Sequence, residues 1–119
     1  MKACWYLTAD LMFPSRVEGV AQRVGVPLVV LPSLAALIRR WIEHEANRPT
    51  LVLIDLVMWD AALAEFLAKA KSLPEPPTVV AYGPHVQTAA LEAARAGGCD
   101  YVLTRGQFDQ QMAAMLSLA

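Results

Sequence analysis

The hydrophobic positions along the chain form five short continuous runs, separated by longer segments in which apolar residues recur every three or four positions. A short run that is apolar at every position is typical of a strand buried on both faces, as strands are in parallel sheets. The pattern therefore predicts five parallel strands, at residues 3–8, 27–31, 50–56, 78–82 and 101–104.

The periodic segments predict five amphipathic helices, because residues three and four apart lie on one helix face. Ser15 and Ser33 precede the first two patterns and are expected to cap them, since their side chains accept hydrogen bonds from free helix amides. Asp60 is expected to open the third helix. Gly25 and the pair Gly97-Gly98 are expected to end the first and fourth helices. The second helix is expected to bury Leu34, Leu37, Ile38, Trp41 and Ile42, and the last two helices are expected at residues 87–96 and 107–118.

Strands that alternate with helices of about ten residues indicate βαβ units in an α/β fold. Right-handed crossover connections leave few topologies for such a chain. We expect a doubly wound (βα)5 fold, with a five-stranded parallel sheet in the flavodoxin-like strand order 2-1-3-4-5. A length of 119 residues fits one domain and no linker or repeat interrupts the chain, so residues 1–119 are expected to form a single domain.

The charge pattern argues against two classes of partner. The net charge is −1 and there is no basic run, whereas nucleic-acid binding needs clustered Lys and Arg. No apolar run reaches the roughly 18–20 residues that span a bilayer, and the apolar N-terminal stretch stops at Asp10, too early for a signal peptide. We therefore expect a cytoplasmic protein that binds neither nucleic acid nor membrane. Cys4 and Cys99 form no CxxC pair and are expected to be reduced core residues.

The composition favours self-association. Hydrophobic residues make up 56% of the chain, and charged residues only 18%, below the roughly 25% that is usual in soluble domains. Charged side chains are thus too few to cover the surface of a small domain, and surplus apolar surface is commonly buried against another chain. Twofold symmetry is the commonest arrangement, so we expect a homodimer.

A binding site in such a sheet would lie beyond the carboxyl ends of the strands, near the point where the strand order reverses. Asp55 is the most informative residue there, because a carboxylate that ends an apolar strand costs several kcal/mol if it is buried without a partner. The residues expected around this pocket are Thr8, Asp10, Asp55, Trp59, Tyr82, His85, Thr104 and Arg105.

Two segments resemble the receiver domains of response regulators, the CheY-like family. Residues 51–58, LVLIDLVM, are similar to the receiver segment that carries the phosphoacceptor aspartate, and the likeness places Asp55 at the acceptor position. Residues 96–103, AGGCDYVL, resemble the segment that enters the fifth receiver strand, and place Tyr101 at the family's conformationally switching aromatic residue. The resemblance follows the order of elements over essentially the whole chain and implies the receiver fold.

The same resemblance reveals departures at the positions that phosphorylation needs. Receivers hold a divalent cation with two adjacent acids after the first strand and with the phosphoacceptor, because Mg²⁺ prefers oxygen ligands. Here that stretch reads Leu7-Thr8-Ala9-Asp10, with one acid. We therefore expect no metal, no cofactor and no catalytic residue, as in a degenerate receiver, or pseudo-receiver. The family's hydroxyl residue falls on Val80, Ala81 or Tyr82, its lysine on Thr104 with Arg105 next to it, and its proline on Trp59.

Several pocket residues allow two interpretations. Asp10 and Asp55 are either a residual metal pair or acids that accept hydrogen bonds, Asp55 from the backbone or from Arg105. Arg105 either binds an anion or pairs with an acid. His85 is either a general base beside Asp55 or an ordinary loop histidine. Trp59 either fills the pocket or packs on the helix below.

The preferred function is a non-catalytic signalling or regulatory module of the two-component type, which binds a protein partner or a second copy of itself. The resemblance implies docking through the fourth helix, fifth strand and fifth helix. Phe108, Met112 and Met115 on the fifth helix are the interface candidates, unless they pack on the sheet. Two alternatives remain open: a phosphorylatable receiver with Asp55 as acceptor, and a small flavodoxin-like enzyme or ligand-binding protein that uses Asp10, Asp55, His85 and Arg105.

Overall fold

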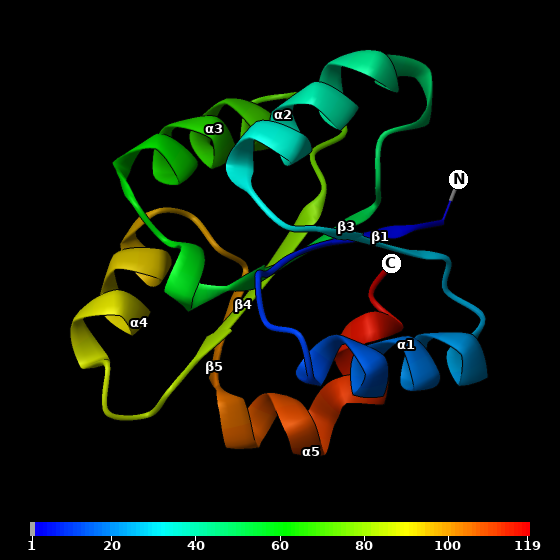
Figure 1. The fold of residues 1–119 in the computed structure, drawn as a ribbon. Coiled ribbons are helices and arrows are strands. Elements are labelled where there is room, and N and C mark those ends of the chain that lie inside the picture. The colour runs from blue at the N-terminus through cyan, green and yellow to red at the C-terminus, as the bar shows by residue number, and fades with distance from the viewer. Residues whose placement is uncertain (1) are drawn as a thin grey trace.

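Five parallel strands form the centre of the molecule in the computed structural model, which describes residues 2–119 (Figure 1). Their order across the sheet is β2-β1-β3-β4-β5, which confirms the predicted topology. The strands are β1 (Cys4–Leu7), β2 (Leu28–Leu31), β3 (Leu51–Asp55), β4 (Thr78–Gly83) and β5 (Tyr101–Thr104).

Helices cover both faces of this sheet, as in a doubly wound fold. In Figure 1, α1 and α5 lie below the sheet, and α2 and α3 lie above it. Apolar residues of α4 pack with those of α2 and α3 in one hydrophobic core, and those of α1 and α5 form the other. The helices are α1 (Phe13–Val24), α2 (Leu34–Glu43), α3 (Ala61–Lys71), α4 (Thr88–Ala96) and α5 (Arg105–Leu116), with short 3-10 turns η1 (Glu45–Asn47) and η2 (Leu56–Met58).

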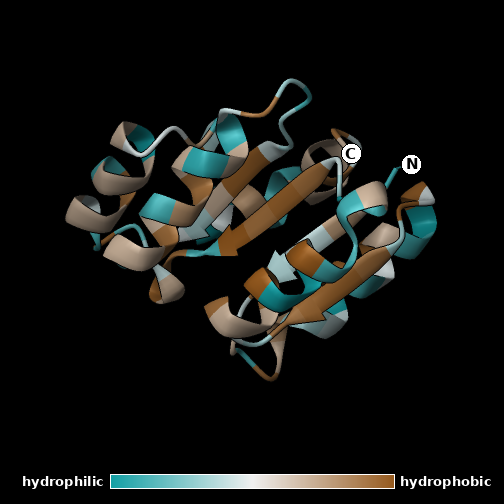
Figure 2. Ribbon diagram, turned by 90° about the horizontal axis from the view of Figure 1, so that it is seen from above, coloured by the Kyte–Doolittle hydropathy of each residue, from teal (hydrophilic) through white to brown (hydrophobic). Residues whose placement is uncertain are grey.

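The two cores follow from the alternation of side chains along each strand. In β1, Cys4 and Tyr6 face α1 and α5, whereas Trp5 and Leu7 face α2 and α3. Every residue of β1 is buried, which explains why this strand is apolar throughout rather than at alternate positions. Figure 2 shows the strands as a hydrophobic layer between the helices.

Local capping decides where the helices begin. Ser33 accepts a hydrogen bond from the amide of Ala36, which confirms the predicted cap of α2. Asp60 opens α3 as expected, and its side chain caps the helix by accepting from the amide of Leu63. The predicted cap at Ser15 is wrong, because α1 already begins at Phe13. Pro14 lies in the first turn of α1, where the fixed φ of proline favours a helix start.

The predicted inward face of α2 is correct only in part. Leu37 and Trp41 are buried, but Ile42 is exposed. The cause is the position of this helix beside β2, an edge strand, so less of the sheet lies beneath it. The residue spacing could not reveal this, because it marks the apolar face of a helix and not the width of the sheet below.

Both cysteines are free thiols. Burial raises the pKa of Cys4 to about 12 and that of Cys99 to about 11, so both stay protonated at neutral pH. Within residues 2–119, no helix combines the length and the apolar character needed to cross a bilayer.

Candidate functional site

Asp55 and Thr8 meet at the carboxyl edge of the sheet, where β3 and β1 end side by side. The hydroxyl Oγ1 of Thr8 donates to Oδ2 of Asp55 at 2.7 Å, and the backbone amide of Val57 donates to Oδ1 at 3.2 Å. Asp55 is only 6% exposed. Each carboxylate oxygen thus has a partner within the protein, which offsets the cost of burying the charge.

Thr8 is itself held in place by backbone groups. Its amide donates to the carbonyl of Leu31 at the end of β2, and its Oγ1 accepts from the amide of Asp10 at 3.1 Å. The hydroxyl therefore links the loop after β1 to the end of β3. Thr8 gives its one hydroxyl proton to Asp55.

Asp10 makes its hydrogen bonds away from Asp55. Its Oδ1 accepts from the amides of Met12 and Phe13, at 2.8 and 3.3 Å, and its Oδ2 lies 3.5 Å from Arg105. The Met12 amide first, then that of Phe13 and the nearby guanidinium, hold the pKa of Asp10 below its ordinary value. Asp10 thus supports the start of α1. Within residues 2–119, no three His, Cys, Asp or Glu side chains lie close enough together to hold a metal ion.

Arg105 and Thr104 contribute to the same edge as structural residues. Arg105 lies with its guanidinium carbon 4.3 Å from the centre of the Phe13 ring, in addition to its contact with Asp10. Thr104 caps α5 through a reciprocal capping box with Gln107. This capping box starts α5 two residues before the predicted position.

A pair of buried tyrosines lies under this edge. The hydroxyls of Tyr6 and Tyr82 hydrogen-bond to each other in the core between the sheet and helices α1 and α5, and the Tyr82 ring stacks on Phe108 with centroids 4.8 Å apart. Tyr82 was predicted as a pocket residue, and its side chain lies in this core. The sequence analysis did not single out Tyr6. Once the register of β1 and β3 is known, the alternation of side chains along the strands places Tyr6, Thr8 and Asp55 on the same face of the sheet.

Burial determines the acidity of both phenols. Desolvation raises the pKa of Tyr6 to about 12 and also raises the pKa of Tyr82. Both stay protonated in the folded chain at a pH where unfolded tyrosine ionises, near 10. Stability from this pair is therefore fully present below pH 10 and is lost as the pH rises from about 10 towards 12.

We expect urea unfolding between pH 8 and 11 to show a steep alkaline loss of stability in the wild type. The Tyr6→Phe/Tyr82→Phe variant should lose less over the same interval, because its phenols no longer ionise on unfolding. Tyr101→Phe is the matched control, since Tyr101 is exposed and outside this pair. Equal pH slopes in the wild type and the double variant would contradict the assignment.

Solved structures match this architecture, although no family model matches the chain and no curated protein matches its sequence. A response regulator receiver domain from Clostridium thermocellum gives a TM-score of 0.77 at 14% identity, over 98% of this chain and 92% of that chain. A response regulator from Burkholderia pseudomallei was solved with a phosphorylated aspartic acid, a calcium ion and citrate. It gives a TM-score of 0.74 at 14% identity, over 98% of this chain and 66% of that chain. An atypical orphan response regulator is described as having a phosphorylation-independent regulatory mechanism. It gives a TM-score of 0.74 at 13% identity, over 98% of this chain and 93% of that chain. The fold is that of a receiver domain.

Within this receiver fold, β4 ends one residue later than predicted. Its last residue is Gly83, which pairs with Thr104 of β5, so the strand continues past Val80, Ala81 and Tyr82. A Cβ atom on Gly83 would come within 3.0–3.1 Å of the Leu56 side chain. Leu56 therefore restricts the space for a side chain at this end of the strand, and Gly83 offers no hydroxyl.

The remaining predicted pocket residues are spread over the receiver fold. Trp59 packs against Gly97 at the end of α4, where an added Cβ would lie 2.8 Å from the ring. His85 is exposed in the loop before α4. Tyr101 is exposed at the first residue of β5, where it pairs with Val80. The structure joins four of the predicted site residues in a chain of hydrogen bonds: Asp55 with Thr8, Thr8 with the amide of Asp10, and Asp10 with Arg105.

The predicted interface on α5 needs correction. Phe108 and Met112 are buried in the core below the sheet, together with Leu116, and Met115 is half-buried against the same core. These four residues recur at helical spacing and face α1 and β4, because α5 must cover that part of the sheet. Phe108 and Met112 are therefore core residues, and a docking surface must use other side chains.

Proposed function

We propose that this chain is a pseudo-receiver: a cytoplasmic signalling module that binds another protein or itself, and whose Asp55 is not phosphorylated through the Mg²⁺-dependent route. The observation that carries the proposal is the hydrogen bonding of Asp55. Both of its oxygens accept from Thr8 and Val57 inside the protein, and the residues directly after β1 are Thr8 and Ala9.

The chemistry of phosphoryl transfer supports this proposal. An aspartate can attack a phosphoryl group only if the negative charges that meet are neutralised, which requires a cation and positively charged side chains. Asp10 is the one acid near Asp55 in the loop after β1, and its Oδ1 accepts from the amides of Met12 and Phe13 at the start of α1. Arg105 is the cationic side chain that was predicted for this pocket, and its ion pair is with Asp10.

The structural likenesses are compatible with either mode of regulation. Of the proteins similar in fold, one contains a phosphorylated aspartic acid and another is described as phosphorylation-independent. The fold alone therefore does not choose between them. The choice rests on the side chains around Asp55, and these favour the phosphorylation-independent mode.

A phosphorylation assay tests the proposal directly. We expect no phosphoryl adduct after incubation of the full chain with acetyl phosphate and Mg²⁺, followed by mass spectrometry. Titration with Mg²⁺ should likewise leave tryptophan fluorescence unchanged at sub-millimolar concentration, because one or two acids form a poor site for a hard cation.

Two outcomes would contradict the proposal. One is an acid-stable, base-labile adduct that is present in the wild type and absent in Asp55→Asn, which would make the chain an ordinary phosphorylatable receiver. The other is a saturable fluorescence change with Mg²⁺ that Asp55→Asn abolishes. Asp60→Asn is the matched control, because Asp60 caps α3 and has no contact with Asp55 among its hydrogen bonds.

A further inference from the structure

A groove between α2 and α3 is lined by large apolar side chains. Figure 1 shows the two helices next to each other above the sheet, and the rings of Trp41 and Phe66 meet between them with centroids 5.3 Å apart. Two adjoining hollows, of about 320 and 340 Å³, lie along this contact and share Ile38, Phe66 and Lys69. We call them together the α2–α3 groove, and its apolar side chains include Leu34, Ile38, Ile42, Ala62, Phe66 and Leu73.

The fold itself does not require the two isoleucines that α2 contributes to this groove. Leu37 and Trp41 of α2 are buried in the core above the sheet. Ile38 and Ile42, one turn apart, are not part of that core, and Ile42 is 67% exposed. A helix that covers a sheet normally carries polar residues on its other faces. The second apolar face of α2 therefore marks a contact surface rather than a packing requirement.

Arg48 places a fixed positive charge at the end of the groove that includes Ile42. Its Nε donates to the carbonyl of Trp41 at 3.2 Å, and its guanidinium carbon lies 4.5 Å from the centre of the Trp41 ring. Glu45 and Glu75 line a neighbouring hollow beside Arg48, but no ion pair within residues 2–119 includes Arg48. The described residues thus position the guanidinium but give it no acidic partner.

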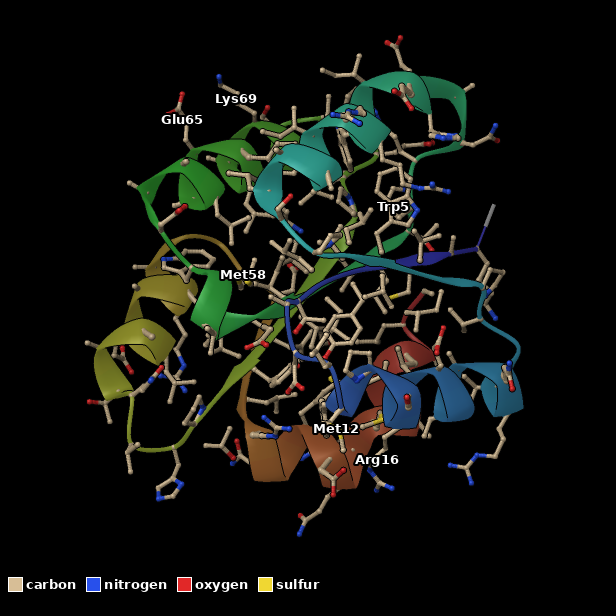
Figure 3. All side chains as sticks on the ribbon, viewed as in Figure 1. Trp5, Met12, Arg16, Met58, Glu65 and Lys69 are labelled. Carbon is tan, nitrogen blue, oxygen red and sulfur yellow. The ribbon has the colours of Figure 1, made fainter. Side chains whose placement is uncertain are left out.

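The other charges of the groove balance each other. Glu65 and Lys69 are one turn apart on α3, and their charged atoms are 3.4 Å apart. In Figure 3 both side chains project from α3 away from the sheet. Both are largely exposed, so this pair stays in water and contributes little to stability. The charge left for a partner is therefore the positive charge of Arg48, which favours an acidic partner.

The chemistry of the groove favours a helix as its occupant. An extended peptide would bury backbone N–H and C=O groups that need partners, whereas the walls here are mainly apolar side chains of two helices. A helix satisfies its own backbone hydrogen bonds and presents apolar residues at three- and four-residue spacing. A nucleic acid would need clustered positive charges instead of one unpaired arginine. From Leu34 to Ile42 the groove extends over roughly 12 Å, at a rise of about 1.5 Å per residue, which matches about two turns of a second helix.

We propose that the α2–α3 groove binds an amphipathic, acidic helix of a partner protein. The apolar face of that helix packs on Ile38, Ile42 and Phe66, and one of its carboxylates pairs with Arg48. This inference rests on the proposed function, because it names the surface and the partner chemistry of the interaction module. It replaces α5 as the interface, since Phe108 and Met112 are occupied in the core.

Selection of short random peptides, displayed on phage, against the immobilised full chain tests the inference. We expect the selected peptides to carry apolar residues three and four positions apart and an Asp or Glu near one end, and to become helical on binding. For a synthetic copy of such a peptide, Ile42→Ser should raise the dissociation constant at least about tenfold, because the contact buries this side chain. Leu11→Ser is the matched control and should leave the dissociation constant unchanged, since Leu11 is also exposed but lies in the loop after β1.

A double-mutant cycle isolates the ion pair of the groove. Arg48→Gln should weaken binding of the acidic peptide about fivefold, because a charge pair at the contact is lost. The same substitution should leave nearly unchanged the binding of a peptide in which Gln replaces the acidic residue. Circular dichroism should show the same fold in the wild type and in all variants.

Several outcomes would overturn the inference. They are a selection that yields no peptide, selected peptides that are basic, and selected peptides that bind Ile42→Ser as tightly as the wild type. Saturable binding of dodecanoate that Ile42→Ser abolishes, without any selected peptide, would assign the groove to a small apolar carboxylate instead. Self-association that Ile42→Ser removes would assign it to a second copy of the chain. The acetyl phosphate assay reads Asp55 and not the groove, so this inference and the pseudo-receiver proposal fail separately.

Discussion

Replacement of Phe108 by alanine is expected to lower the free energy of unfolding by about 3–5 kcal/mol, the range found for large-to-small changes of buried aromatic residues. Phe108 is 0% exposed, stacks on Tyr82 and contacts the ring of Phe13, with centroids 6.2 Å apart. The smaller side chain leaves a cavity between α5, α1 and β4, because the rings around it cannot all move into the space. For a domain of this size the midpoint of thermal unfolding should fall by about 10–20 °C.

Urea or thermal unfolding of Phe108→Ala measures this effect, with Gln111→Ala as the matched control. Gln111 is exposed on the same helix, so its replacement should change the free energy of unfolding by less than about 0.5 kcal/mol. The sequence pattern alone offered Phe108 as an interface residue. If Phe108→Ala kept its stability but lost self-association, that first interpretation would be right and the core assignment wrong.

Replacement of Thr8 by aspartate is expected to destabilise the chain by about 2–4 kcal/mol in the absence of divalent cations. The change removes the hydroxyl that donates to Asp55 at 2.7 Å and places a second carboxylate next to a buried one. Two carboxylates at this distance cannot both ionise without a cation between them. Millimolar Mg²⁺ should therefore raise the unfolding midpoint of Thr8→Asp, because ligand binding to the folded state stabilises it, and leave that of the wild type unchanged.

Two further variants separate the causes of this effect. Thr8→Val removes the donor without adding charge, so it should cost less than Thr8→Asp and show no response to Mg²⁺. Thr8→Asp/Asp55→Asn removes the repulsion between the acids, so it should recover part of the stability and lose most of the Mg²⁺ response. An equal response of the wild type and Thr8→Asp to Mg²⁺ would show that Thr8 does not take the place of a cation beside Asp55.

The carboxyl edge thus combines a closed polar interior with an apolar rim. Beneath the surface, Thr8 satisfies Asp55, and the tyrosine pair satisfies itself. At the surface, Leu11 and Met12 project from the turn that Asp10 caps. The hydrogen-bonded interior and the exposed apolar side chains therefore lie at the same end of the sheet.

The sequence by itself determined the order and type of the elements. The apolar runs located all five strands, and β5 begins and ends where the pattern predicted, at Tyr101 and Thr104. The caps at Ser33 and Asp60 were also predictable, because each bonds to an amide three residues ahead in the chain. Burial on both faces requires a continuous apolar run, and this local signal was sufficient to imply a parallel sheet.

Only the tertiary structure decided which side chains meet and which remain exposed. Thr8 and Asp55 are 47 positions apart, and Tyr6 and Tyr82 are 76 positions apart, so the strand register had to be known before either pair could be recognised. The exposure of Leu11, Met12 and Ile42, and the burial of Phe108 and Met112, depend on what other elements cover. Hydropathy ranks these residues alike, whereas the packing of helices on a sheet of finite width places some inside and leaves the others in solvent.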